Sequence, residues 1–187
     1  MGVLQQYKPK RRVVSTRGTS RFGCKTNANY KKVLLCIWWD CRGIINKEYL
    51  KSGQDINSTI YSNMLIKVSD AIREKRKKRV KKKRVLFHQD NACLHVSAMT
   101  SWTLYTLEWD LMQHPPYSPD IAPPDYYMFS HLQLRLDGTI SHLNDEVKNE
   151  VDHFPGSRLS QFFAEGVEKL PKRWQTIVDL NGDYYPH

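Results

Sequence analysis

Two aspartates, Asp90 and Asp125, are the residues of this chain best suited to metal-dependent chemistry. Asp90 follows the apolar run Val85-Leu86-Phe87, which is too short for a helix and is typical of a buried strand. Asp125 follows two prolines, and proline suits the first turn of a helix. A carboxylate at a strand end and one at a helix start can together bind a hard cation such as Mg²⁺ or Mn²⁺, which prefers oxygen ligands.

Each aspartate also has a purely structural interpretation. Asp90 with Asn91 is compatible with ordinary turn chemistry after a strand, and Asp125 with a helix start that the macrodipole favours. Taken alone, the spacing slightly favours this structural interpretation. The choice between the two therefore depends on the wider motif.

Two segments surround these aspartates: His-Gln-Asp-Asn-Ala at 88–92, followed by His95, and Pro-Pro-Tyr-Ser-Pro-Asp-Ile-Ala-Pro-Pro-Asp-Tyr at 115–126. Together they resemble the catalytic domain of mariner/Tc1-type DNA transposases. In the mariner branch the second and third catalytic aspartates are separated by the same 34 residues that lie between Asp90 and Asp125. The segments 170–174 and 181–185 resemble the C-terminus of that domain, so the resemblance covers nearly the whole chain.

The resemblance implies a ribonuclease H-like α/β fold, a mixed sheet flanked by helices. It also implies a site where carboxylates hold two divalent ions, Mg²⁺ or Mn²⁺, for DNA strand cleavage and transfer. Asp90 and Asp125 carry over as the catalytic and metal-binding residues. Asn91 and His95 match the same motif, and we expect His95 to pack or to contact DNA rather than to bind metal. The family works as a dimer, so DNA and a second copy are the expected partners.

One motif of the family has no counterpart here. The first catalytic aspartate of the family lies on a strand reading roughly Thr-Gly-Asp-Glu-Lys-Trp, upstream of the Trp-Trp strand, and no such sequence occurs in this chain. We therefore expect a chain that begins just after that aspartate and lacks the first central strand, unless Met1 is a mis-assigned start. Residues 12–16 are the candidate replacement for that strand. Asp40 also ends a strand, but we expect a hairpin-turn residue there.

An incomplete set of carboxylates leaves open whether the chain is an enzyme. We expect a DNA-binding fragment whose strand cleavage and transfer are impaired. The alternative is a catalytically inactive relic, or a domesticated module used only for non-specific DNA binding or for dimerisation.

The charge of the chain points to a polyanionic partner. The formal net charge is +10, and ten of the twelve residues from 73 to 84 are Lys or Arg. Three interpretations of this run compete: a solvated helix end, a nuclear-localisation address and a phosphate-contacting patch. The last two are compatible with each other. The residues that we expect to contact DNA, in the nucleus, are Arg73, Lys75, Arg76, Lys77, Lys78, Arg79, Lys81, Lys82, Lys83, Arg84 and His95.

The remaining sequence predicts one globular domain. Residues 1–31 are basic without periodicity and are expected to form an arm or loop, whereas 32–187 are expected to form the partial catalytic domain. Predicted strands cover 32–40, 44–50, 85–87 and 109–112, and predicted helices begin near 59, 97, 125, 144, 159 and 171. Met99 and Trp102 are expected to point inward from the second helix. Four cysteines without paired spacing indicate a reducing compartment, and no apolar run is long enough for a membrane span.

Overall fold

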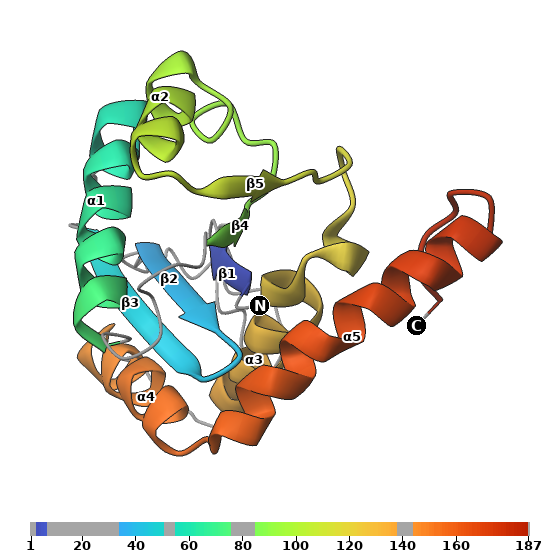
Figure 1. The fold of residues 1–187 in the computed structure, drawn as a ribbon. Helices are drawn as coiled ribbons and strands as arrows, with labels where there is room; N and C mark the ends of the chain where they lie inside the picture. Colours follow the sequence, from blue (N-terminus) through green and yellow to red (C-terminus); the bar gives the residue numbers. More distant parts are fainter. Residues whose placement is uncertain (1–2, 7–33, 51–54, 76–84, 138–143, 187) are drawn as a thin grey trace, which may run out of the picture.

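A five-stranded sheet lies at the centre of the computed structural model, which describes residues 3–6, 34–50, 55–75, 85–137 and 144–186 (Figure 1). The spatial order of the strands is β3-β2-β1-β4-β5. Their bounds are β1 (Val3–Gln6), β2 (Leu34–Asp40), β3 (Gly43–Leu50), β4 (Leu86–His88) and β5 (Asp110–Met112). The predicted α/β class and the four strands predicted after residue 31 are therefore confirmed.

β1 occupies the centre of this sheet, so the expectation that the first central strand is missing is wrong. It runs antiparallel to β2, with Gln5 opposite Trp39, and parallel to β4, with Gln5 level with His88. Without β1, backbone N–H and C=O groups of two buried strands would have no ladder partner, which is costly. The candidate replacement, residues 12–16, lies outside the described residues, as does most of the expected arm. The boundary near residue 31 therefore stays a prediction, although residues 3–6 belong to the sheet.

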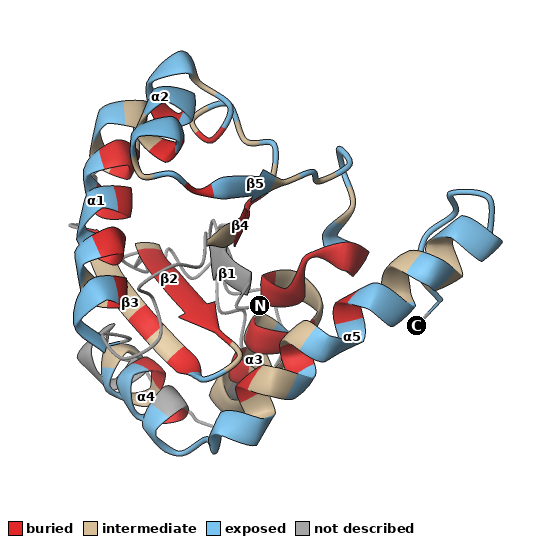
Figure 2. Cartoon of the chain, in the orientation of Figure 1, coloured by how far each residue is buried: buried red, intermediate tan, exposed pale blue. Residues whose placement is uncertain are grey.

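β2 is buried on both of its faces and divides the core into two clusters (Figure 2). Because successive residues of a strand face opposite sides, Cys36 and Trp38 enter one cluster while Ile37 and Trp39 enter the other. Burial raises the pKa of the Cys36 thiol to about 12, so this cysteine is a packed, protonated group.

The helices α1 (Ser58–Lys75) and α2 (Ala98–Thr106) cover one face of the sheet. Asn57 caps α1, since its side chain accepts a hydrogen bond of 2.9 Å from the backbone N–H of Ile60. In α2 only Thr100 and Leu104 are buried. The prediction that Met99 and Trp102 point inward is wrong, since both are exposed.

The opposite face is covered by segments that follow β5: η1 (Pro119–Ile121), the π-helical turn η2 (Pro124–Met128), α3 (Phe129–Asp137), α4 (Asn144–Gly156) and α5 (Ser160–Asp179). The two last predicted helices, from 159 and from 171, are one continuous helix. Pro171 lies inside α5, where its ring removes one backbone donor without ending the helix.

Gly166 lets α5 approach the sheet closely. A Cβ atom there would lie 2.5 Å from Cδ1 of Tyr127 and 2.9 Å from Cη2 of Trp39. Among the described residues, no helix is both long and apolar enough to span a membrane.

Candidate active site at the carboxyl end of β4

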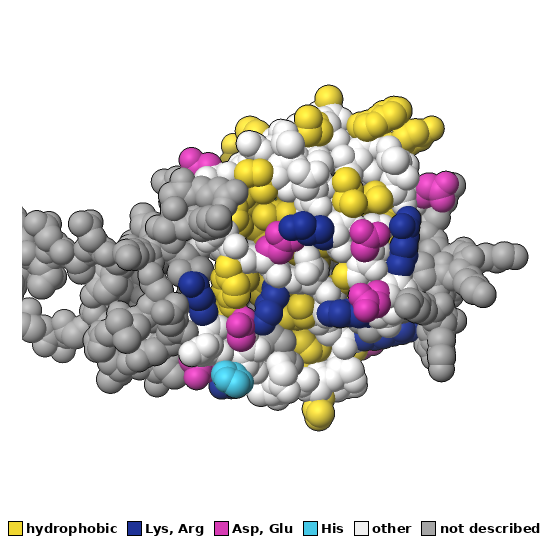
Figure 3. All heavy atoms as spheres, turned by 90° about the vertical axis from the view of Figure 1, so that its left-hand side faces the viewer, with side chains coloured by type: hydrophobic (Ala, Val, Ile, Leu, Met, Phe, Trp, Pro, Cys, Tyr) yellow, Lys and Arg dark blue, Asp and Glu magenta, His cyan; other side chains and the backbone are white. Residues whose placement is uncertain are grey.

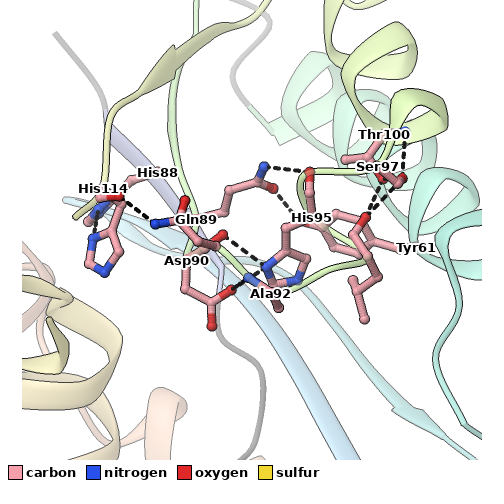
Figure 4. Close-up of polar contacts among 11 residues, drawn as sticks. Tyr61, His88, Gln89, Asp90, Ala92, His95, Ser97, Thr100 and His114 are labelled. Atoms are coloured by element: carbon pink, nitrogen blue, oxygen red, sulfur yellow. Dashed lines mark hydrogen bonds and ion pairs between the residues drawn. The ribbon is translucent and has the colours of Figure 1, made fainter. Parts of the chain in front are cut away.

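Asp90 lies just past the end of β4, on the turn that leads towards α2 (Figure 4). Its Oδ1 accepts a hydrogen bond of 3.0 Å from the backbone N–H of Ala92, and the same oxygen contacts Nδ1 of His95. The side chain of Asp90 is nevertheless 46% exposed. The turn chemistry expected for Asp90 is therefore present. It leaves a partly exposed carboxylate at the carboxyl end of β4, and α/β sheets bind ligands at the carboxyl ends of their strands.

A buried polar network fixes the position of His95 against Asp90. The hydroxyl of Tyr61 donates to Oε1 of Gln89 at 2.8 Å, and Nε2 of Gln89 donates to the backbone oxygen of His95 at 3.0 Å. The imidazole of His95 packs on the ring of Tyr61, with 4.6 Å between centroids. Burial raises the pKa of Tyr61 well above its ordinary value, so its hydroxyl remains a donor. We call Tyr61, Gln89 and His95 the Asp90 anchor.

The imidazole of His95 is only 2% exposed, which favours the packing role among its two predicted roles. Its contact with DNA stays a prediction. Sequence reasoning identified His95 from the motif but gave no role to Tyr61 or Gln89. The spacing of Tyr61 within α1 marks it only as a core position.

Two histidines that the sequence did not single out lie beside this turn. His88 Nε2 and His114 Nδ1 are 3.0 Å apart, the distance of a hydrogen bond in which one ring donates. Burial, with a smaller effect of His114, lowers the pKa of His88 to about 4, and burial also lowers that of His114. Both rings are therefore neutral at neutral pH. Nδ2 of Asn91 donates to the backbone oxygen of His114 at 2.6 Å, which joins the loops after β4 and β5.

Asp125 lies in the first turn of η2, as the two preceding prolines predicted. Its backbone N–H donates to the oxygen of Ala122 at 2.8 Å, and the hydroxyl of Ser130 donates to its backbone oxygen at 3.0 Å. The negative charges of Asp90 and Asp120 both raise the pKa of His114, against the larger effect of burial. Asp90 and Asp120 thus both act electrostatically on His114, and Asp125 follows Asp120 by five residues in the sequence.

Arg173 of α5 holds the motif before Asp125 in place. Its Nη1 donates to the backbone oxygen of Asp120 at 2.8 Å. Its guanidinium carbon lies 4.0 Å from the ring centroid of Tyr126 and 4.1 Å from that of Tyr185. The backbone N–H of Tyr185 donates to Oδ2 of Asp120 at 2.8 Å. We call Asp120, Tyr126, Arg173 and Tyr185 the Asp125 anchor.

Sequence reasoning missed this anchor. Arg173 and Tyr185 do belong to segments 170–174 and 181–185, which resemble the transposase C-terminus, but no pattern within those segments connects them to residue 120. The only signal was that both segments and the Asp125 motif resemble one family.

The carboxylates of Asp90 and Asp125 are of the ligand type that hard divalent cations prefer, and two carboxylates suit one ion better than two ions. Within the described part of the chain, no group of three or more His, Cys, Asp or Glu residues could hold a metal ion. β1, with the sequence Val-Leu-Gln-Gln, contains no carboxylate. Asp40 accepts a hydrogen bond of 2.9 Å from the N–H of Arg42, which confirms its place in the hairpin turn. Two carboxylates suffice to bind Mg²⁺ or Mn²⁺ together with phosphate oxygens.

The residues expected to contact DNA lie mostly outside the described residues. Of the basic run, Arg73 and Lys75 are described, at the end of α1. Arg73 forms an exposed ion pair with Asp70 at 3.5 Å, and Nζ of Lys75 donates to the backbone oxygen of Ile45 at 2.8 Å. Residues 76–84 lie outside the described residues, so DNA contact by this run stays a prediction.

Comparison with known proteins identifies relatives of the whole fold. A transposase family model, a partial DDE domain, matches residues 6–82. The chain is 36% identical over 177 residues to the Mariner Mos1 transposase of Drosophila mauritiana, which covers 94% of this chain but only 49% of that protein. The chain thus spans about half the length of this relative.

Solved structures of transposase catalytic domains also match this chain. The Mos1 transposase catalytic domain, solved with Raltegravir and Mn, matches with a TM-score of 0.84 and 31% identity over 98% of this chain and 84% of that one. A Mos1 mariner paired end complex with Mn matches with a TM-score of 0.85 and 31% identity, covering 98% of this chain and 56% of that one. The ribonuclease H-like fold implied by the sequence is therefore confirmed.

Proposed function

Because this chain belongs to the mariner family of DNA transposases, we propose that it binds DNA and holds a divalent cation at Asp90 and Asp125, with impaired strand cleavage and transfer. DNA transposition is the activity of the family, and divalent metal accompanies the Mos1 catalytic domain. The observation that carries the proposal is the sequence of β1. This strand takes the central position, yet it offers amides where the resemblance expects a carboxylate.

Two groups of residues restrain the two aspartates of the proposed site. The Asp90 anchor restrains one carboxylate oxygen through His95 and the N–H of Ala92. The Asp125 anchor restrains the backbone on either side of Asp125. A Mg²⁺ or Mn²⁺ ion bound there would polarise a phosphate oxygen of DNA and stabilise the charge that develops during strand cleavage. Without a third carboxylate, the position of a second ion is poorly defined, and this is the reason for impaired chemistry.

The partners we propose are DNA and a second copy of the chain, in the nucleus. A net charge of +10 and the basic run from 73 to 84 supply the cations that phosphates require. The same run has the composition of a nuclear-localisation address. The Mos1 paired end complex supports both DNA and a second copy as partners.

The second candidate function is a DNA-binding or dimerising module without catalysis. The absence of any carboxylate in β1 favours it. In that case the basic run is the working feature and the two aspartates are dispensable. DNA affinity should then fall steeply with salt and be unchanged in Asp90→Ala.

A calorimetric Mn²⁺ titration tests the proposed site. We expect binding to the wild-type chain that is lost in both Asp90→Ala and Asp125→Ala. Asp55→Ala, which removes an exposed carboxylate before α1, is the matched control and should bind like the wild type. No Mn²⁺ binding by folded wild-type protein would leave only the second candidate. Nicking of supercoiled DNA that depends on Asp90 would show instead that catalysis is intact.

Substitutions in β1 test whether the lack of a third carboxylate weakens metal binding. Successive residues of a strand face opposite sides of the sheet, so only one of Gln5→Asp and Gln6→Asp can add a carboxylate on the side of the site. Gln5 is level with His88, two residues before Asp90, which favours Gln5→Asp. We expect that variant to bind Mn²⁺ about tenfold more tightly. An equal effect of both substitutions would reflect added charge alone.

A further inference from the structure

Two histidine nitrogens face each other beside Asp90, and the proposed function uses neither of them. Nε2 of His88 and Nδ1 of His114 are 3.0 Å apart, and the ring centroids are separated by 5.0 Å, with 54° between the ring planes. Figure 4 shows these rings on the opposite side of Asp90 from His95. We call His88 and His114 the histidine pair.

The ends of two neighbouring strands bring the histidine pair together. His88 is the last residue of β4 and is level with Met112, the last residue of β5. His114 follows Met112 by two residues, and its backbone oxygen accepts from Nδ2 of Asn91 at 2.6 Å. The side chain of His88 is buried, and that of His114 is half-buried. The backbone therefore fixes both rings in positions that a ligand does not have to create.

The distance between the two nitrogens suits a shared metal ion as well as a hydrogen bond. In a tetrahedral zinc site each Zn–N bond is about 2.0–2.1 Å long, which places two nitrogen ligands about 3.3 Å apart. The observed separation of 3.0 Å is close to that value. In the hydrogen-bonded pair one ring donates its N–H. If that proton moves to the other nitrogen of the same ring, both facing nitrogens present lone pairs, and no proton is lost overall.

Negative charge around the histidine pair favours a cation there. Burial lowers the pKa of both histidines, whereas the charge of Asp90 raises it for both and that of Asp120 raises it for His114. Asp120 is only 6% exposed, and its Oδ1 is buried without a hydrogen-bond partner among the described residues. A carboxylate oxygen in this state is stabilised by a nearby cation, or by a water molecule that the cation binds.

We propose that the histidine pair is a second metal site, for a borderline divalent ion such as Zn²⁺, separate from the Mg²⁺ or Mn²⁺ site at Asp90 and Asp125. Imidazole nitrogens suit Zn²⁺, Ni²⁺ and Cu²⁺, whereas carboxylate oxygens suit Mg²⁺ and Mn²⁺. The pair supplies two ligands, because no group of three or more His, Cys, Asp or Glu residues within the described ranges could hold a metal ion. Water completes the coordination, so the ion should bind weakly and exchange readily.

A titration of the full chain with Co²⁺, without an affinity tag, tests the proposal. Co²⁺ replaces Zn²⁺ in nitrogen sites, and tetrahedral Co²⁺ absorbs visible light much more strongly than the octahedral hydrated ion. Over a range of about 1 µM to 1 mM Co²⁺, we expect visible bands that saturate with one ion per chain. Added Zn²⁺ should abolish these bands, because it competes for the same two nitrogens.

Substitution of single histidines shows whether the ion binds at the pair. His88→Gln and His114→Gln each remove one nitrogen ligand, while the amide can still hydrogen-bond the remaining ring. Both variants should raise the Co²⁺ dissociation constant at least tenfold. Circular dichroism verifies that they fold, and half-buried His114→Gln decides the result if buried His88→Gln does not fold.

The matched control is His153→Gln, which removes an exposed histidine of α4 and should bind Co²⁺ like the wild type. On the face that Figure 3 shows, the described histidine surface is limited to a small area at the lower edge. Among its described side chains, that face therefore offers no cluster of histidines that would compete for the ion.

Three results would overturn the proposal. The first is a folded wild-type chain without visible bands up to about 1 mM Co²⁺. The second is binding that folded His114→Gln leaves unchanged, or that His153→Gln weakens equally. The third is loss of the bands in Asp125→Ala, because the ion would then lie at the aspartates. Asp125→Ala should instead lose Mn²⁺ and keep the Co²⁺ bands. Wild-type Co²⁺ bands without Mn²⁺ binding would refute only the proposed function, so the two failures are seen separately.

Discussion

The turns that carry Asp90 and Asp125 are held by anchors of different construction on different sides of the sheet. The Asp90 anchor is a short chain of buried hydrogen bonds, from Tyr61 through Gln89 to His95. The Asp125 anchor is partly exposed and depends on Arg173, 53 residues away from the carbonyl of Asp120 that it binds. Removing one member of a buried polar network leaves its partner unsatisfied and lowers the free energy of unfolding. A stacked guanidinium at the surface contributes less to that free energy. The two aspartates should therefore differ in how easily substitution displaces them.

The largest loss of stability should result from substituting Gly166, where α5 approaches the sheet closely on the Asp125 side. Gly166→Val would push α5 away from Tyr127 and Trp39. We expect the free energy of unfolding to fall by about 3 kcal/mol, measured by urea denaturation. The control is Gly156→Val, where an added Cβ atom meets nothing within 4 Å, and it should cost less than about 1 kcal/mol. Equal losses in the two variants would show that α5 can move without cost.

Acidification should lower the stability of the fold through protonation of His88, on the Asp90 side. Burial lowers the pKa of His88 from 6.5 to about 4, so between these pH values the unfolded chain binds a proton that the folded chain does not. Stability should therefore fall as the pH decreases through this window, by about 3 kcal/mol for this group. The measurement is the free energy of unfolding at pH 7 and pH 4.5.

His88→Leu should lose less stability than the wild type over the same pH step. His153→Leu, which removes an exposed histidine of α4, serves as the control for the loss of one imidazole from the chain. If His88→Leu and the wild type lose the same free energy, the pair of His88 and His114 does not contribute to acid sensitivity.

Two tyrosine substitutions compare the anchors directly. Tyr61→Phe removes the donor to buried Oε1 of Gln89, and we expect a loss of about 2 kcal/mol. Tyr126→Phe removes a donor to the backbone oxygen of Gly166 in the partly exposed anchor, and about 1 kcal/mol should be lost. Urea denaturation of both variants gives the difference. A larger loss in Tyr126→Phe would reverse the assignment of the Asp90 anchor as the stronger one.

Substitution of Arg173 itself should lower stability by about as little as Tyr126→Phe. Arg173→Met keeps the apolar stem but removes the hydrogen bond to Asp120 and both cation–π contacts. We expect a loss of about 1 kcal/mol, part of which Arg173→Lys recovers. Arg158→Met is the control, because Arg158 lies farther from its rings, at 4.9 and 5.1 Å, and should cost about half as much. Thermal unfolding of the four proteins, with wild type included, is the measurement.

The parts of the fold that sequence predicts well are those where local pattern and final contacts agree. β2 reads as a buried strand because apolar residues fill both of its faces. The cap of α1 and the two prolines before Asp125 act on neighbouring residues, so their effect is visible in the sequence.

The parts that sequence mispredicts depend on contacts from far along the chain. β1 contains two apolar residues within a basic stretch, and only the gap between β2 and β4 makes it a strand. In α2, Thr100 is buried because Leu94 offers its backbone oxygen, so the large apolar residues Met99 and Trp102 remain outside. Pro171 does not end α5, because packing of the long helix outweighs one lost hydrogen bond.

The central place of β1 also determines the order in which the sheet can form. Its residues are the first of the described chain, but one of its partners, β4, lies more than 80 residues later. During synthesis β2 and β3 can form their hairpin early and β1 can join β2, whereas the pairing of β1 with β4 must wait until residues 86–88 leave the ribosome. Contacts between such distant residues close slowly, because a long loop loses entropy on closure. Until then the edge of β1 that pairs with β4 is open, and misfolding of this chain should begin at that edge.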